Sequence, residues 1–251
     1  MSLQACADIV AKGDPDRYAA AMAAPVDARR VLFPLYAFNV EVARAPWVAS
    51  EPMIGEMRLQ WWRDVLEEIG GGKQVRSHEV TTPLSKVLHP PYAEVLDRLV
   101  AARRWDLYQD AFEDDAHFDA YLEKTGGGLM WVAAACLGAH VTAFDAISKI
   151  GAATALVRFL QAVPELERRG RVPLVDGRAE AVQRLAKEAL KTLPDVRSHL
   201  GIPKTARPAL LEGWQTRALL IQIAKDPLRV AEGRVGLSEF GKRFRLMRAS
   251  L

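Results

Sequence analysis

The chain has 251 residues, of which 50% are hydrophobic and 26% are charged, and its formal net charge is +3. This length lies near the upper end for one domain, and the hydrophobic share can supply a sizeable core. Two cysteines, Cys6 and Cys136, are too few for a disulfide framework and lie in no metal-binding spacing. We therefore expect reduced thiols and a cytoplasmic location.

The N-terminal residues, MSLQACADIVAKGDPDRY, carry acids early and contain no long apolar run, so they do not resemble a secretory signal. The most apolar segment, GLMWVAAACLGA at residues 128–139, has 12 residues. A membrane-spanning helix needs about 20. The segment therefore predicts a buried helix.

Helix-forming residues dominate the chain, and no alternation of apolar and polar residues is long enough for a sheet. No linker and no repeat divides the sequence. It predicts one all-α domain over residues 1–251. Proline opens the helices that start at residues 25 and 52, and Pro164 is expected to close another. The predicted helices cover residues 3–11, 16–22, 25–45, 53–69, a short piece from 82, 92–111, 114–137, 142–163, 179–193, 208–224 and 237–251.

The stretch AAPVDARRVLFPLYAF at residues 23–38 resembles the opening of the active site in the squalene/phytoene synthase family, where a pattern like P…R…LYAFxRxxDD…D occurs. The resemblance implies an isoprenoid-synthase-type helical bundle with a central cavity. On the family frame, the aspartates would fall at Ala43, Arg44 and Trp47. None of these side chains can bind a hard cation, which needs oxygen ligands.

The family's second aspartate motif resembles residues 150–174, IGAATALVRFLQAVPELERRGRVPL. Here the two aspartates are replaced by Ala162 and Leu166. Glu165 and Glu167 flank the second position but lie about 100° from its helical face. In the family, both motifs bind magnesium, and the magnesium ions hold a prenyl diphosphate. The substitutions predict no catalytic residue, no metal site and no cofactor.

A third segment, FDAYLEKTGGGLMWVAA at residues 118–134, resembles the family's LxxYCxxxAGxVGxM helix. In the family, such small residues admit the isoprenoid chain and allow close helix approach. Helix packing alone would also explain them. We expect a central cavity between the helices of Ala43 and Ala162; alternatively, Trp47 or Arg44 fills that space. The expected lining residues are Phe33, Tyr36, Met130, Trp131 and Phe159.

Other polar groups predict no further catalytic site. The five histidines are scattered without an H-E-x-x-H pattern, so neither zinc nor a Ser-His-Asp triad is indicated. The acidic run WDLYQDAFEDDAHFDAYLE is typical of a solvated face with a helix cap. Trp61, Trp62 and Arg63 fit a core and its rim better than a platform for stacking bases. No nucleic-acid partner is expected.

The string AFNVEVARAPWVASEPMIGEMRLQWWRDVLEEI at residues 37–69 is similar to a non-catalytic branch of the family, the branch of a mitochondrial complex I assembly factor. That branch has a similar AFNxE…QPxIGxMRxQFW stretch and also lacks the aspartates. The resemblance implies an assembly protein linked to respiratory complex I, which binds a protein partner or an apolar lipid or isoprenoid. Two alternatives stay open: a magnesium-dependent prenyl transferase that joins isoprenoid diphosphates, and an isoprenoid carrier.

The C-terminal end is basic, with ten Lys or Arg against four Asp or Glu from residue 201 onward. Phe240, Phe244 and Met247 lie at i, i+4 and i+7, so a helix there would have one apolar face and a basic remainder. Such a helix can lie on an anionic membrane, peripheral to the inner membrane, or contact an acidic partner. Alternatively, its apolar face packs onto its own domain.

Overall fold

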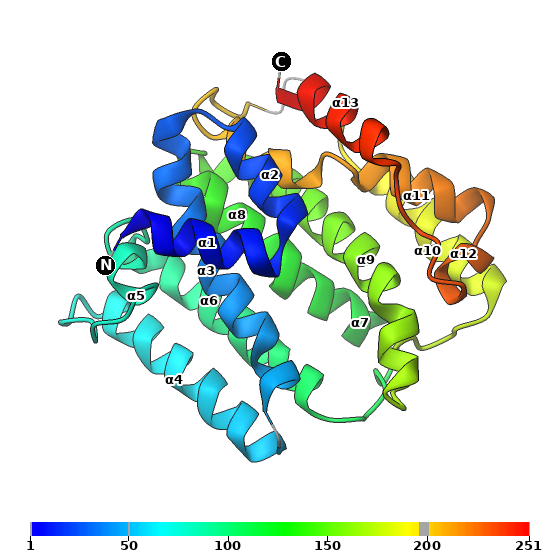
Figure 1. Cartoon of the computed structure of the whole chain (residues 1–251), viewed down its shortest axis with the longest axis horizontal. Helices are drawn as coiled ribbons and strands as arrows, with labels where there is room; N and C mark the ends of the chain where they lie inside the picture. The colour runs from blue at the N-terminus through cyan, green and yellow to red at the C-terminus, as the bar shows by residue number, and fades with distance from the viewer. Residues whose placement is uncertain (1, 50, 196–200, 251) are drawn as a thin grey trace.

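The structure is a computed structural model that describes residues 2–49, 51–195 and 201–250. Helices make up the regular secondary structure of these ranges, and no strand occurs within them. The predicted all-α fold is therefore confirmed (Figure 1). The α-helices are α1 (Leu3–Gly13), α2 (Pro15–Ala23), α3 (Val26–Val48), α4 (Pro52–Gly70), α5 (Thr81–Leu84), α6 (Pro90–Ala102), α7 (Asp115–Leu122), α8 (Gly128–Cys136), α9 (Phe144–Arg168), α10 (Ala179–Thr192), α11 (Thr216–Lys225), α12 (Leu228–Ala231) and α13 (Glu239–Ser250).

Four further helical segments connect or extend these helices: the 3-10 turns η1 (Arg103–Leu107), η3 (Val141–Ala143) and η4 (Arg207–Gly213), and a π-helical turn, η2 (Glu123–Gly127). The predicted helix over residues 92–111 thus ends at Ala102, and the one over 208–224 is divided into η4 and α11. The predicted helix over 114–137 is real, but it contains the π-turn.

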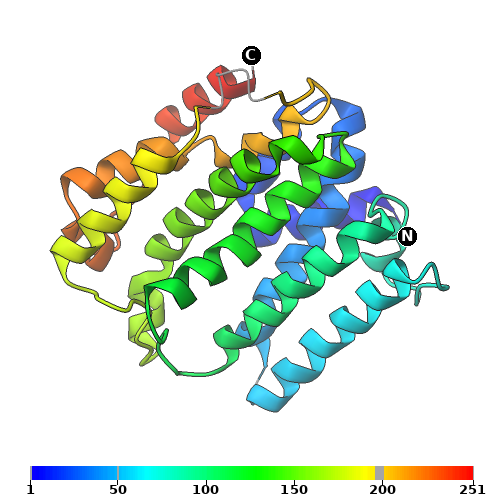
Figure 2. The same ribbon diagram turned by 180° about the vertical axis from the view of Figure 1, so that it is seen from behind.

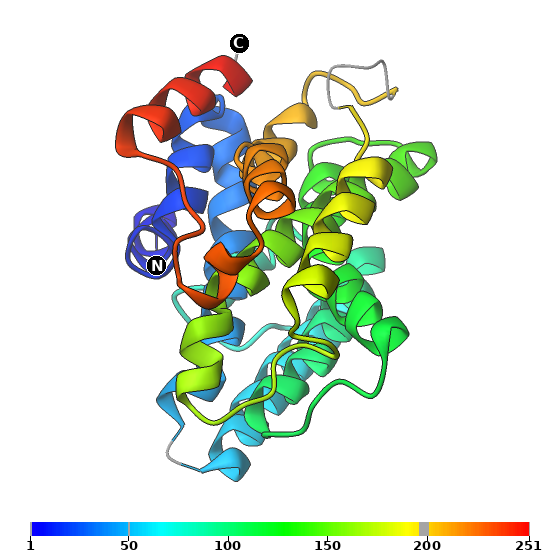
Figure 3. The ribbon, with the colours of Figure 1, turned by 90° about the vertical axis from the view of Figure 1, so that its right-hand side faces the viewer.

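The helices surround a central layer of α3, α8 and α9. α1 packs on α3, α4 packs on α6, and α10 packs on α11. Figure 2 shows α4, α6 and α8 from behind, and Figure 3 shows α13 as the outermost helix at the C-terminal end. The hydrophobic core forms two clusters, one around α3, α4, α6 and α8 and the other around α7, α9, α10 and α11. α9 contributes to both clusters and so joins the two halves of the bundle.

Pro164 does not end α9, which continues to Arg168. The prediction that Pro164 closes this helix is therefore wrong. Proline removes one backbone hydrogen bond, but Leu166 beyond it is buried in the second core cluster, and Glu165 forms ion pairs with Arg168 and Arg169. These contacts stabilise the last turn. The helix ends before Gly170, whose φ of +77° favours glycine.

The glycines of η2 bring it into direct backbone contact with α9. A Cβ atom on Gly151 would lie 2.4 Å from the carbonyl oxygen of Gly126, and one on Gly126 would lie 2.4 Å from the Cβ of Ala155. A side chain at either position would therefore push the two elements apart. Close helix approach is thus one function of these glycines. Gly126 and Gly151 also line the cavity described below.

By length and composition alone, residues 141–168 could cross a membrane. In the bundle, 61% of the apolar window in this stretch is buried. A core helix of a folded protein passes the same test of length and composition. The apolar segment at residues 128–139 lies in α8 and the turn after it, and residues 128–135 are buried as predicted.

Candidate functional site

A cavity of about 1090 Å³ lies between α3 and α9, as the fold prediction required. All five positions that replace the family aspartates line it: Ala43, Arg44 and Trp47 from α3, and Ala162 and Leu166 from α9. The alternative, a space filled by Trp47 or Arg44, is wrong because both of these residues are exposed at the rim.

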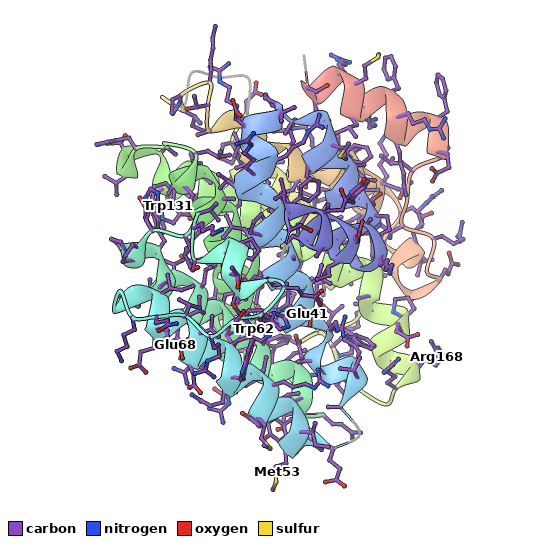
Figure 4. The ribbon with its side chains drawn as sticks, turned by 60° about the vertical axis from the view of Figure 1, so that its left-hand side comes forward. Glu41, Met53, Trp62, Glu68, Trp131 and Arg168 are labelled. Atoms are coloured by element: carbon purple, nitrogen blue, oxygen red, sulfur yellow. The ribbon has the colours of Figure 1, made fainter. Side chains whose placement is uncertain are left out.

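Of the five side chains expected to line this cavity, Phe159 does so. Phe33, Tyr36, Met130 and Trp131 are instead buried in the first core cluster, and they are not among the lining residues. The reason is visible at Tyr36, whose ring lies beneath the guanidinium of Arg17 at 5.1 Å. Arg17, which lines the cavity, thus covers Tyr36. Figure 4 shows Trp131 on the side of the bundle opposite Arg168.

An ion-pair network forms the floor of the cavity. Nε of Arg17 donates to Oε2 of Glu212 at 2.6 Å, and its Nη1 donates to Oδ2 of Asp14 at 2.9 Å. Nη1 of Arg158 donates to the same oxygen of Asp14. Arg17 and Glu212 are buried. Sequence reasoning did not identify these four residues as part of the site.

The network shifts the pKa values of Asp14 and of the neighbouring Tyr36. Burial alone would raise the pKa of Asp14, but the charges of Arg17 and Arg158 outweigh it, so this pKa lies below its usual value. Burial, together with the charge of Glu212, holds the pKa of Tyr36 well above its usual value. Asp14 is therefore a carboxylate, and Tyr36 a neutral phenol, at neutral pH.

A second polar cluster lies where η1 meets the cavity. Nη1 of Arg103 donates to Oδ2 of Asp106 at 3.0 Å and to the hydroxyl of Tyr121 at 2.7 Å. That hydroxyl donates to Oδ1 of Asp106 at 2.9 Å. Arg171, which follows the turn at Gly170, donates to the carbonyl oxygen of Asp106 at 3.0 Å. Both arginines line the cavity.

The rim of the cavity carries a contact between α3 and the end of α9. The guanidinium carbon of Arg169 lies 4.2 Å from the centre of the Trp47 ring. Such a cation–π contact is worth about 0.5–1 kcal/mol at an exposed site. It joins the two helices at the positions where the family motifs would hold metal.

The donor set does not fit the magnesium ions that the family motifs bind. Asp14, Glu212 and Asp106 are each held by arginine, and Glu165 pairs with arginines outside the floor. No group of three or more His, Cys, Asp or Glu residues that could hold a metal occurs within residues 2–49, 51–195 and 201–250. A hard divalent cation needs several free oxygen ligands, which these carboxylates cannot supply while they are paired.

Both cysteines are free thiols. Burial raises the pKa of each thiol to about 11. At Cys6 the negative charge of Glu79 also contributes. They are thus poor nucleophiles at neutral pH, in line with the expectation of ordinary thiols.

The family model for squalene/phytoene synthase matches residues 10–175, about two thirds of the chain. This chain belongs to the squalene/phytoene synthase family. Its helical bundle is similar to a dehydrosqualene synthase, with a TM-score of 0.75 and 17% identity, over 98% of this chain and 94% of that one. It is also similar to squalene synthase HpnC from Alicyclobacillus acidocaldarius, with a TM-score of 0.73 and 16% identity, over 90% and 94%. At these identities the likeness shows the isoprenoid synthase fold.

Curated relatives of this family member are complex I assembly factors. The chain is 30% identical over 162 residues to "NADH dehydrogenase (ubiquinone) complex I, assembly factor 6" of Homo sapiens, which covers 63% of this chain and 48% of the relative. It is 31% identical over 170 residues to the homolog of that factor in Drosophila melanogaster, which covers 63% and 50%. The chain thus spans about half the length of the curated relatives it matches.

The floor network predicts a specific pH dependence of stability. In Asp14→Asn the side chain can still cap α2, as Asp14 does through its bond to the amide of Arg17, but its charge is lost. We expect the free energy of unfolding at pH 7 to fall by about 3 kcal/mol, as for other broken buried ion pairs. Because the pKa of Asp14 is lowered in the folded state, this difference persists down to about pH 4 and is lost as the pH falls further.

Urea unfolding followed by circular dichroism between pH 7 and pH 3 measures this difference. Asp145→Asn is the matched control, because Asp145 is exposed and pairs only with Lys149 of its own helix. Its effect is expected to stay below about 0.5 kcal/mol. Equal stability of Asp14→Asn and the parent at pH 7 would contradict a stabilising floor network.

Proposed function

We propose that this family member is a non-catalytic protein that assists the assembly of respiratory complex I by binding a protein partner. The observation that carries the proposal is the state of the cavity. A cavity of about 1090 Å³ is present, but the positions of the family aspartates are occupied by side chains without carboxylates, and its inner acids pair with arginine. Prenyl transfer in this family needs metal to take up the charge of the diphosphate. The names of the assembly-factor relatives support the proposed process.

An exposed apolar surface at the start of α4 supports a protein partner. Met53 and Met57 are 72% and 67% exposed, and Ile54 is also exposed. Figure 4 shows Met53 pointing away from the bundle. Flexible methionine side chains adapt to a partner surface at little cost, and a contiguous exposed apolar patch is typical of an interaction site. The proposed occupant is a complex I subunit or assembly intermediate.

The first test uses cells that naturally produce the chain. Deleting its gene is expected to lower the amount of assembled complex I on native gels, and the tagged parent chain is expected to restore it and to co-purify with identified complex I subunits. The double variant Met53→Glu, Met57→Glu is expected to fold but to lose both properties, because two charges cannot enter an apolar contact.

Met22→Glu is the matched control, because Met22 is an exposed methionine on a different helix, α2. It is expected to behave like the parent. Normal complex I levels after deletion would refute the assembly function, and full rescue by the α4 double variant would refute this binding surface.

The second test separates this function from prenyl transfer. The purified chain is expected to release no diphosphate from farnesyl or geranylgeranyl diphosphate above background, with or without magnesium, because the metal ligands are missing. An active squalene synthase assayed in parallel shows that the assay works. Magnesium-dependent product formation by the purified chain would favour the prenyl transferase alternative, and binding of a prenyl chain without turnover would favour the carrier.

We also propose that α13 contacts an anionic membrane surface. No residue of α13 is buried, and Phe240 is 81% exposed, with Phe244 and Met247 also exposed. α13 is held to α2 by the ion pair of Lys242 with Asp16 at 3.3 Å. The apolar side chains therefore remain available, together with the basic residues Arg243, Arg245 and Arg248.

Sedimentation with lipid vesicles tests this contact. The parent is expected to bind vesicles containing anionic lipid more strongly than neutral ones, with binding weakened by salt. The double variant Phe240→Ser, Phe244→Ser is expected to bind at least about tenfold less, because it loses most of its apolar surface. Ile221→Ser, at an exposed apolar residue of α11, is the control. Salt-insensitive binding that is equal for parent and double variant would contradict the proposal.

A further inference from the structure

The outer face of α4 forms one continuous stripe. On an α-helix of 3.6 residues per turn, Met53, Met57 and Trp61 lie within about 80° of one another. Asp64 and Glu68 fall within the same sector over the next two turns. Figure 4 shows Met53 and Glu68 toward the two ends of the helix. The buried residues of α4 lie toward the other side: Gly55, Leu59, Trp62, Val65, Leu66 and Ile69.

The two halves of this stripe differ in what covers them. In the first half, Met53 and Met57 are exposed. The second half consists of Trp61, Asp64 and Glu68, and it is contacted by the strap, residues 71–79, which connects α4 with α5. The chain therefore covers one half of the stripe with its own segment and leaves the other half bare.

Arg76 of the strap makes the contacts with the second half of the stripe. Its guanidinium carbon lies 5.6 Å from the centre of the Trp61 ring. Its Nε donates to Oε1 of Glu68 at 2.9 Å, and its backbone N–H donates to Oε2 of the same carboxylate at 3.1 Å. Its Nη1 lies 3.9 Å from Oδ2 of Asp64. One arginine thus engages an aromatic ring and two carboxylates.

The side chain of Arg76 can leave α4 while the strap stays folded. The side chain is 36% exposed, so it can rotate into water. Its backbone is held separately, because the hydroxyl of Thr81 donates to the carbonyl oxygen of Arg76 at 2.5 Å. Exposed ion pairs contribute little to stability, since water competes for both partners. Another cation can therefore replace Arg76 at low cost.

The shape and charge of the stripe define what can bind along it. The stripe is straight and about 22 Å long, at a rise of 1.5 Å per residue, so it fits a helix that lies along α4. Its first half is apolar. Its second half suits a guanidinium or ammonium group, which can lie on Trp61 and pair with the two carboxylates. The same carboxylates disfavour an anionic membrane surface at this face.

We propose that Arg76 is a built-in substitute for a basic residue of the protein partner. The partner contributes an amphipathic helix whose apolar side chains pack on Met53 and Met57 and whose arginine or lysine replaces Arg76 on the second half of the stripe. Arg76 thus competes with the partner and restricts this surface to helices that carry a cation. The proposal rests on the α4 surface given under the proposed function and adds the chemistry of its partner.

Two variants break the same ion pairs from opposite sides, and co-purification of identified complex I subunits with the tagged chain measures both. Arg76→Ala removes the competitor and leaves the carboxylates, so it is expected to raise the amount of these subunits about threefold at equal expression. The double variant Asp64→Asn, Glu68→Gln also releases Arg76, but it removes the partner's carboxylates. It is expected to lower the amount about tenfold.

Arg98→Ala and Glu94→Gln are the matched controls, because they break an exposed ion pair within α6 from its two sides. Both are expected to behave like the parent. Circular dichroism checks that each variant is folded, and none of these substitutions alters a buried side chain. A merely structural role of the Arg76 pairs predicts the same effect from both sides, whereas competition with a partner predicts opposite effects.

Unchanged amounts, or changes in the same direction, for Arg76→Ala and the acidic double variant would refute the competition. The assembly function would then still stand, because the parent chain retains its subunits. If the parent itself co-purifies with no complex I subunit, the proposed partner is refuted, and the role of Arg76 with it. The two failures are therefore distinguishable.

Discussion

The paired charges around Arg17 hold together segments that are far apart in the chain. Arg17 and Glu212 are 195 residues apart, and Asp14 and Arg158 are 144 apart. The network thus joins the α1–α2 junction, α9 and η4 across the floor of the cavity. Removing two buried charges from water is costly unless each is paired. The pairs therefore depend on the bundle that brings their helices together.

The same network determines how the inner carboxylates of the cavity are used. In a magnesium-dependent site, free carboxylates converge on cations. Here arginines from α2, α9 and η1 pair with the inner carboxylates. The helices that enclose the cavity have the arrangement seen in the family fold, although its inner carboxylates are paired. The bundle alone therefore does not identify the reaction.

Small residues preserve the shape of the cavity independently of its charge. The contact of Gly126 with Gly151 sets the distance between η2 and α9, and Gly126 lies within the π-turn. Helix packing alone requires glycine at these positions, whether or not the cavity has an activity. Their presence is therefore evidence for the fold and not for an activity.

The sequence by itself determined the helical class, the family frame and the absence of carboxylates at Ala43, Arg44, Trp47, Ala162 and Leu166, because these depend on composition and on local motifs. The tertiary structure decided what lines the cavity. Tyr36 lies on the expected helix, but Arg17 from another helix covers it. Packing between segments also decided that α9 continues past Pro164. It likewise decided that Phe240 on α13 stays exposed. Local patterns show which face of a helix is apolar, but whether another element covers that face depends on contacts between segments that are distant in sequence.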